Sequence, residues 1–209
     1  AAAVLGGRDS VFVHPLASYG DVVVKEYRRG GHVSQFVRLH HLRRGPSRGE
    51  REFRNLRAVR AMGVHAPEPV AFASRGLVIY RSWLVTRYVP NRGSLAALGQ
   101  ARAHGLERLV VATVRQIAPL LAHGVLHADL HPGNVIVDHD DGPWLLDFDR
   151  AFWFHGGPQE LCRRYVGRWA RAVRKHALPE ELEEVFRAEL SRSVGLAPAR
   201  VHGIATARG

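Results

Sequence analysis

The sequence predicts an α+β protein with two lobes, a β-rich N-lobe that contains one helix and a mostly helical C-lobe. Three observations lead to this fold class. Short β-branched segments bounded by Gly, Pro or Ser dominate the first 90 residues. A single segment with helical spacing of its apolar residues, 47–62, interrupts them. After a break at residues 90–93 the spacing becomes helical, so we divide the chain into lobes of residues 1–90 and 91–209.

Local signals define the elements of the N-lobe. Ser47 and Glu50 have the spacing of a capping box at the start of the helix, and Gly63 is placed to end it. The Pro-rich segment 66–69 favours a loop before the next strands. The strands that we expect in this lobe are residues 10–13, 21–27, 70–73, 77–80 and 83–88.

In the C-lobe, longer helical patterns alternate with short apolar segments that lie among turn residues. Pro179 suits the first position of the last helix, where a missing N–H costs no hydrogen bond. We expect helices at residues 106–123, 159–176 and 179–194, and strands at residues 125–126, 135–137 and 144–146.

Composition and charge narrow the class of protein. With 46% hydrophobic residues among 209, the chain can build a packed core, and its one cysteine excludes a disulfide framework. We expect no signal peptide and no transmembrane helix, because no sufficiently long apolar run is present. The formal net charge of +11 favours a polyanionic partner, either nucleic acid, anionic lipid headgroups or a phosphorylated substrate.

The strongest chemical signal is the segment HADLHPGN, residues 127–134, followed by DFD at residues 147–149. Phosphoryl transfer needs a carboxylate that accepts a hydroxyl proton, and oxygen ligands that hold Mg²⁺. Asp129 fits the first role, and Asn134 and Asp147 fit the second. The structural alternative is a solvated polar turn, but the order of both motifs favours chemistry.

A second signal is Lys25 at the end of an apolar strand. Only two of the 30 basic residues are lysines, so a lysine at this position is an exception in an arginine-rich chain. A buried ammonium group needs an anionic partner, and Glu52 on the following helix is the better candidate, because the capping box already explains Glu50. The alternative is that Lys25 and Glu52 are ordinary surface residues.

Together these residues resemble the motifs of the protein-kinase-like superfamily: a strand lysine, a helix glutamate, H-x-D-x-x-x-x-N and D-F-x, in that order. Within the superfamily, KEYRRGG at residues 25–31 and DFDR at residues 147–150 resemble the lipopolysaccharide kinases, which are the bacterial Kdo kinase and heptose kinase family. The resemblance covers roughly residues 6–155. It implies the two-lobed protein-kinase-like fold.

The resemblance also implies a function. The chain would use ATP and Mg²⁺ to phosphorylate a sugar hydroxyl of the lipopolysaccharide inner core, with 3-deoxy-D-manno-octulosonic acid (Kdo) attached to lipid A as the expected acceptor. Lys25 would hold the α- and β-phosphates and Glu52 would pair with it. Asp129 would orient and deprotonate the acceptor hydroxyl, while Asn134 and Asp147 would bind Mg²⁺.

The sequence also departs from protein kinases. No G-x-G-x-x-G precedes the strand lysine, and Gly6 and Gly7 are the candidate phosphate cover, with an ordinary turn as the alternative. The metal motif ends in Asp149 instead of Gly, and His131 stands where Ser/Thr protein kinases usually have Lys. No A-P-E segment follows. These departures argue against a regulated protein kinase.

Other cations are candidates for the substrate and for a membrane surface. Arg28, Arg29 and Arg150 could bind anionic groups of the acceptor, or they could be solvated or paired with Asp149. The basic residues on the predicted helix could contact acidic lipid headgroups, or form a solvated face. They are Arg163, Arg164, Arg168, Arg171, Arg174 and Lys175. We therefore expect a peripheral protein on the cytoplasmic face of the bacterial inner membrane.

Two smaller expectations concern buried groups, and two alternative functions stay open. His127 should brace the catalytic loop through hydrogen bonds. The aromatic run 152–154 should pack in the core or between the lobes, with a docking surface as the alternative. One alternative is a small-molecule kinase that resembles the aminoglycoside or choline phosphotransferases, although RRGG at residues 28–31 argues against it. The other is a basic nucleic-acid-binding module, but we expect no nucleic-acid partner because no such motif is present.

Overall fold

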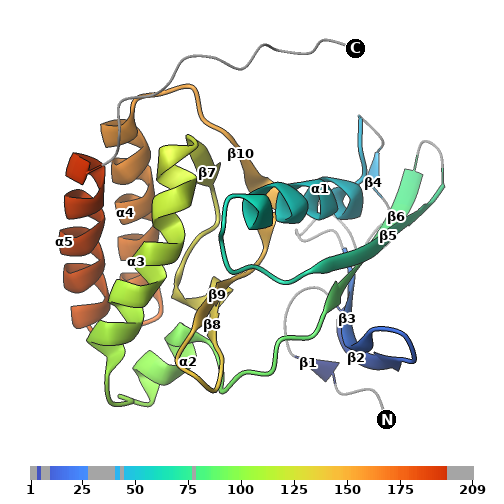
Figure 1. Ribbon diagram of the computed structural model, residues 1–209, viewed down its shortest axis with the longest axis horizontal. Coiled ribbons are helices and arrows are strands. Elements are labelled where there is room, and N and C mark those ends of the chain that lie inside the picture. Colours follow the sequence, from blue (N-terminus) through green and yellow to red (C-terminus); the bar gives the residue numbers. More distant parts are fainter. Residues whose placement is uncertain (1–3, 6–9, 28–40, 43–44, 77–78, 197–209) are drawn as a thin grey trace.

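The computed structural model describes residues 4–5, 10–27, 41–42, 45–76 and 79–196. A β-sheet with helix α1 lies at one end of the molecule, and helices α2 to α5 lie at the other (Figure 1). This mixed α and β architecture agrees with the predicted kinase-like fold class. Gly6, Gly7, Arg28 and Arg29, which we predicted to bind phosphate or substrate, lie outside the described residues.

The described strands of the N-terminal half form one antiparallel sheet in the order β1-β2-β3-β6-β4, with β5 paired to β6. Their bounds are Val4–Leu5 (β1), Ser10–Leu16 (β2), Gly20–Glu26 (β3), His41–Leu42 (β4), Pro69–Arg75 (β5) and Ile79–Arg87 (β6).

Two expectations about these strands were wrong. The strands expected at 77–80 and 83–88 are one strand, β6, because no turn residue separates them and Arg81 and Ser82 continue the pairing with β5. The strand expected at 10–13 continues to Leu16, since the pairing with β3 extends to the turn at residues 17–19.

Helix α1 (Arg48–Ala61) packs against the sheet through residues at helical spacing, of which Glu52, Leu56 and Val59 are buried. Ser47 caps it, accepting a hydrogen bond from the Glu50 amide at 3.2 Å, as the capping-box spacing predicted. Gly49, in the first turn of the helix, must be glycine, because a Cβ at this position would lie 2.5 Å from the carbonyl oxygen of Trp83. The start of α1 therefore lies directly on β6.

The C-terminal half contains the helices α2 (Leu95–Gln100), α3 (Leu106–Ala122), α4 (Pro158–Lys175) and α5 (Glu181–Leu196). Two antiparallel strand pairs lie between α3 and α4: β7 (Val125–His127) with β10 (Ala151–Trp153), and β8 (Val135–Val137) with β9 (Pro143–Leu145). Short 3₁₀ turns, η1 (Pro132–Asn134) and η2 (Phe148–Arg150), complete the connections.

The sequence prediction missed α2, whose six residues make fewer than two helical turns, and the three-residue strand β10. Pro179 is not the first residue of the last helix, which begins at Glu181. Its carbonyl instead accepts a hydrogen bond from the Leu182 amide at 3.1 Å, in a turn that precedes the helix.

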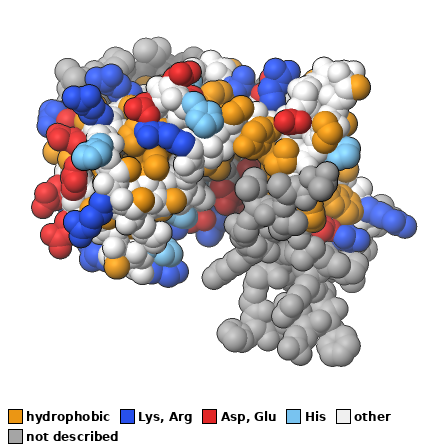
Figure 2. All heavy atoms as spheres, turned by 90° about the horizontal axis from the view of Figure 1, so that it is seen from below, with side chains coloured by type: hydrophobic (Ala, Val, Ile, Leu, Met, Phe, Trp, Pro, Cys, Tyr) orange, Lys and Arg blue, Asp and Glu red, His pale blue; other side chains and the backbone are white. Residues whose placement is uncertain are grey.

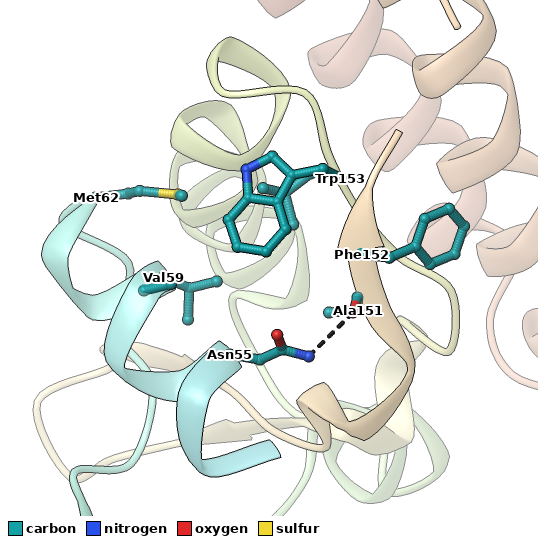
Figure 3. A pocket seen from close by; sticks show the side chains of 8 residues that line it. Asn55, Val59, Met62, Ala151, Phe152 and Trp153 are labelled. Carbon is teal, nitrogen blue, oxygen red and sulfur yellow. Dashed lines mark hydrogen bonds between the residues drawn. The ribbon is translucent and has the colours of Figure 1, made fainter. Parts of the chain in front are cut away.

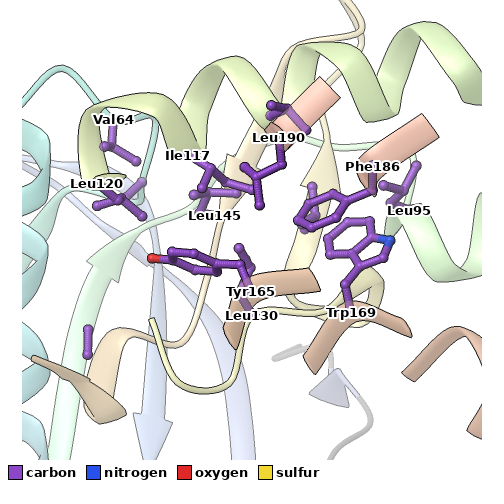
Figure 4. Close-up of a cluster of buried hydrophobic side chains, with 14 of the residues drawn as sticks. Val64, Leu95, Ile117, Leu120, Leu130, Leu145, Tyr165, Trp169, Phe186 and Leu190 are labelled. Carbon is purple, nitrogen blue, oxygen red and sulfur yellow. The ribbon is translucent and has the colours of Figure 1, made fainter. Parts of the chain in front are cut away.

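The helical half is held together by a core of side chains from α3, α4 and α5 (Figure 4). Trp169 of α4 stacks on Phe186 of α5 with ring centroids 4.1 Å apart, and its indole N–H donates to the Leu182 carbonyl at 2.7 Å. Leu130, which follows Asp129, is fully buried in the same core. The core therefore anchors the segment that carries the expected catalytic carboxylate. None of the helices in the described part of the chain has the length and apolarity needed to span a bilayer.

Candidate active site

Lys25 of β3 lies between two carboxylates from distant parts of the chain. Its Nζ donates to Glu52 Oε2 of α1 at 3.2 Å and to Asp147 Oδ1 at 2.7 Å. The placement of α1 on β6 brings Glu52 under the strand that carries Lys25, because β3 is the neighbour of β6. The strand lysine, the helix glutamate and the metal motif thus meet at one point.

Burial and charge act against each other in this cluster. Burial lowers the pKa of Lys25, but the carboxylates of Glu52 and Asp147 raise it more, so the net shift is upward and Lys25 is a cation. Burial raises the pKa of Glu52, against the effect of Lys25. Burial also raises the pKa of Asp147, but the ammonium group of Lys25 outweighs this and the net shift is downward. Asp147 is therefore ionised, as a cation ligand must be.

Tyr27 and Arg48 complete this cluster, and the sequence analysis missed both. Tyr27 is fully buried and its hydroxyl bonds to Glu52. Lys25 Nζ and Arg48 Cζ lie 4.9 Å and 4.8 Å from the centroid of its ring. The strand alternation was a signal for Tyr27, since residues two apart point to the same side. No local pattern singled out Arg48.

The loop after β7 is held by backbone and side-chain hydrogen bonds. His127, whose pKa burial lowers, contacts the Leu146 carbonyl through Nε2 at 2.8 Å, which agrees with the predicted bracing role. The Asn134 side-chain amide donates to the backbone carbonyl of Asp129 at 3.0 Å. The Leu146 amide donates to the Asn134 carbonyl at 2.9 Å. These bonds place Asn134 beside both Asp129 and the residue that precedes Asp147.

Asp147 has the left-handed conformation, with φ of 65°, two residues after the end of β9 and immediately before η2. This conformation is costly for a non-glycine residue and marks a constrained position. Asn55 of α1 supports the following turn, because its Nδ2 donates to the carbonyls of Phe148 at 2.7 Å and Ala151 at 3.0 Å. Asp149, the residue that replaces glycine in the motif, is buried and pairs with Arg48.

The side-chain oxygens of Asn134 and Asp147 fit a hard divalent cation that also binds phosphate oxygens. The Asn134 amide nitrogen is engaged with the Asp129 carbonyl, so its oxygen is the group that can face a cation. Asp147 supplies an ionised carboxylate. The described residues contain no cluster of three or more His, Cys, Asp or Glu side chains that could hold a metal ion alone. One carboxylate and one amide oxygen are typical of Mg²⁺ sites, in which phosphates and water supply the other ligands.

Asp129 forms an ion pair with Arg168, which the sequence analysis had placed on the basic, lipid-facing surface of a helix. Arg168 of α4 donates to Asp129 Oδ1 through Nε at 3.1 Å and through Nη2 at 2.6 Å. Arg168 is thus not part of a lipid-facing surface, which corrects one member of the predicted basic face. Two other members are engaged on the helix surface, Arg164 with Glu160 and Arg174 with Glu183.

The remaining candidates lie at the surface. Arg150 is exposed, and among the described residues the ion pair of Asp149 is with Arg48 and not with Arg150. Phe152 and Trp153 are 46% and 54% exposed and so lie outside the core, whereas Phe154 packs against it. Trp153 lines a small hollow between β10 and α1, opposite Val59 and Met62 (Figure 3).

Basic side chains are spread over one face of the molecule. On the face shown in Figure 2, Lys and Arg side chains lie among Asp and Glu side chains and do not gather into a single patch. On α4, Arg163 and Arg171 are exposed. On the face shown, the basic side chains are therefore distributed among acidic ones.

Three features define a protein-kinase-like fold: a sheet lysine paired with a glutamate of helix α1, a loop with Asp129 and Asn134, and Asp147 after a strand hairpin. The sequence model of the lipopolysaccharide kinase (Kdo/WaaP) family matches residues 8–153. That match covers well over half of the chain, and the chain belongs to this family.

Curated relatives carry a more specific name. The 3-deoxy-D-manno-octulosonic acid kinase of Vibrio vulnificus (strain YJ016) is 31% identical over 132 residues, which are 62% of this chain and 56% of that protein. The enzyme of the same name from Vibrio parahaemolyticus is 31% identical over 162 residues, 76% of this chain and 67% of the relative. The enzyme of the same name from Xylella fastidiosa (strain M23) is 32% identical over 194 residues, which are 90% of this chain and 71% of the relative. The chain spans little more than half the length of the first relative.

Proposed function

We propose that this chain is an ATP-dependent kinase that phosphorylates a sugar hydroxyl of the lipopolysaccharide inner core, with Kdo attached to lipid A as its acceptor. One observation carries the proposal: a single buried lysine, Lys25, contacts both the helix glutamate Glu52 and the motif aspartate Asp147. Membership of the Kdo/WaaP family and the relatives named as Kdo kinases support the choice of acceptor.

In this proposal the residues divide the reaction between them. Lys25 holds the α- and β-phosphates of ATP, and Glu52 and Tyr27 hold Lys25. Asn134 and Asp147 hold Mg²⁺, which when bound neutralises charge on the phosphates. The acceptor hydroxyl oxygen attacks the γ-phosphorus, the bond from that phosphorus to the β,γ-bridging oxygen breaks, and ADP leaves with the bond electrons. The hydroxyl proton passes to the carboxylate of Asp129.

We also propose that the protein meets its acceptor at the cytoplasmic face of the inner membrane, as a peripheral protein. The net charge of +11 supports this, because basic residues near an anionic surface contribute about 1 kcal/mol each. The full chain should sediment with anionic vesicles, fail to sediment with neutral vesicles, and be released by high salt, because salt screens this attraction. Equal binding to both vesicle types would count against the location.

Arg28, Arg29 and Arg150 are the proposed contacts to the carboxylate and phosphates of the acceptor. Arg28 and Arg29 follow β3, the strand that carries Lys25. Alanine at either position should raise KM for the lipid acceptor more than KM for ATP. Equal KM values for the acceptor in variant and wild type would remove these residues from the acceptor site.

Radiolabelled phosphate transfer tests the function directly. Wild type and Asp129→Asn would be given [γ-³²P]ATP and Mg²⁺ with Kdo-bearing lipid A, heptose-bearing core, an aminoglycoside, choline or a mixed protein substrate, in parallel. Label on Kdo-bearing lipid A with wild type alone supports the proposal. Preferred labelling of the aminoglycoside or choline would favour a small-molecule kinase. If Mg-ATP produces no thermal shift and no acceptor is labelled, both kinase functions fail and a binding module remains.

A further inference from the structure

Arg168 lies beyond residues 8–153, the part of the chain that matches the family, and it contacts the carboxylate of Asp129. Both of its hydrogen bonds go to one oxygen of Asp129, Oδ1, at 3.1 Å and 2.6 Å. The two side chains are 27% and 30% exposed. Among the described residues no hydrogen bond reaches the second oxygen, Oδ2, so one edge of the carboxylate is held and the other is open.

Helix α4 fixes the position of Arg168 through its buried neighbours. Tyr165, one turn earlier on the same face, accepts from the His127 amide at 3.0 Å and donates to the Val125 carbonyl at 2.9 Å. Trp169 joins α4 to α5 through its stacking on Phe186. The guanidinium group therefore projects from a rigid helix that is hydrogen-bonded to β7, the strand that leads into the loop of Asp129.

The loop itself does not offer a cation in this place. His131 stands where Ser/Thr protein kinases usually have Lys, and its Nδ1 accepts a hydrogen bond from the Gly133 amide at 3.0 Å. A ring nitrogen that accepts a hydrogen bond carries no proton, so the His131 ring is not a cation in this arrangement. The cation beside Asp129 thus comes from α4 and not from the loop.

We propose that Arg168 is a positioning residue for the catalytic carboxylate. By holding Oδ1, it turns Oδ2 of Asp129 toward the acceptor hydroxyl, whose proton Oδ2 accepts as the new oxygen–phosphorus bond forms and ADP leaves. The inference rests on the function proposed above. If Asp129 loses this orientation, kcat falls, because a small displacement of a reacting group raises the activation barrier. Nucleotide binding stays intact.

The test compares Arg168→Ala, Arg168→Gln and Arg168→Lys with Arg192→Ala. Arg192 is a matched control, since its guanidinium group also pairs with a carboxylate, that of Glu189, on the distant surface of α5. Steady-state assays with the acceptor that wild type phosphorylates give kcat and KM. Titration with Mg-ATP gives Kd, and thermal unfolding checks that each variant folds.

We expect Arg168→Ala and Arg168→Gln to lower kcat at least about tenfold, with KM and Kd for ATP within about twofold of wild type. Arg168→Lys should restore part of kcat, and Arg192→Ala should behave as wild type. Because Arg168 acts through Asp129, adding Arg168→Ala to Asp129→Asn should lower the residual kcat by less than about twofold.

Other outcomes overturn the inference. Unchanged kcat in folded Arg168→Ala would show that Asp129 needs no such support. An equal loss of kcat in the Asp129→Asn background would mean that Arg168 acts on the phosphates and not through Asp129. If neither the Ala nor the Gln variant folds, Arg168 is a structural residue. Absence of transfer by wild type, in contrast, overturns the proposed function itself.

Discussion

Arg48, the first residue of α1, forms an ion pair with Asp149, which lies 101 residues later in the chain. The Nε–Oδ2 distance is 3.0 Å, and the Asp149 side chain is only 5% exposed. Because α1 also carries Glu52, and Asp149 follows Asp147 by two residues, this pair ties together both carboxylates that contact Lys25. The residue that replaces glycine in the metal motif therefore has a defined structural partner.

Removing this pair should destabilise the protein. Arg48→Ala leaves the Asp149 carboxylate buried without its main cation, which should lower the free energy of unfolding by about 1–3 kcal/mol. Adding Asp149→Asn should recover part of that loss, since the uncompensated charge is removed. Urea unfolding of wild type and of these two variants measures the change in the free energy of unfolding.

Arg54→Ala is the control for that series, because Arg54 lies on the same helix and makes an exposed pair with Glu50. Its cost should be below about 0.5 kcal/mol. Equal losses in Arg48→Ala and Arg54→Ala would mean that the buried pair contributes no more than a surface pair.

Asp129→Asn should keep the fold and Mg-ATP binding but lower kcat by roughly 100-fold or more, because a positioned general base contributes about 10²–10⁴. The side chain keeps its shape and loses only its ability to take up a proton. Single-turnover transfer from labelled ATP gives the rate. A rate near that of wild type would remove Asp129 from the proposed role.

Lys25→Arg should lose most of the activity although the charge is conserved. The ammonium group contacts Glu52, Asp147 and the ring of Tyr27 in a confined space, and a planar guanidinium group cannot reproduce these three contacts. Lys175→Arg, at the other lysine of the chain, is the matched control and should retain kcat. Full activity of Lys25→Arg would show that Lys25 does not hold the phosphates.

Asp147→Ala should abolish Mg²⁺-dependent binding of ATP, because it removes the carboxylate proposed as the main cation ligand. Calorimetric titration with and without Mg²⁺ separates the metal-dependent part of the affinity. The exposed Asp140 provides a control, since Asp140→Ala removes a carboxylate outside the cluster. Wild-type affinity for Mg-ATP in Asp147→Ala would contradict the assignment.

Stability should fall as the pH drops below about 6.5 because of His127. Burial lowers its pKa in the folded state, whereas the unfolded chain takes up a proton near 6.5. The unfolded state then binds more protons, so acid favours unfolding by up to about 1.4 kcal/mol per pH unit. Denaturation between pH 7.5 and 5.5 should show a smaller loss in His127→Gln than in wild type. Identical pH profiles would exclude His127 as the cause.

Much of the fold and part of the site could be predicted from local patterns. The capping residues of α1 and the apolar run of β3 are signals within a few residues, and the structure contains both elements close to their predicted bounds. The order of Lys25, Glu52, Asp129, Asn134 and Asp147 also pointed to one site. The short helix α2 and the strand β10 were not predicted.

The sequence by itself thus determined the order of the elements and the chemical types available to the site. Only the tertiary structure decided which arginines pair with the carboxylates of the site. The chain has 28 arginines. Arg48 and Arg168 reach their carboxylates over separations of 101 and 39 residues. Such pairs depend on where α1 and α4 pack, and packing is a property of the whole core, whereas helical and strand periodicity reports only on neighbours along the chain.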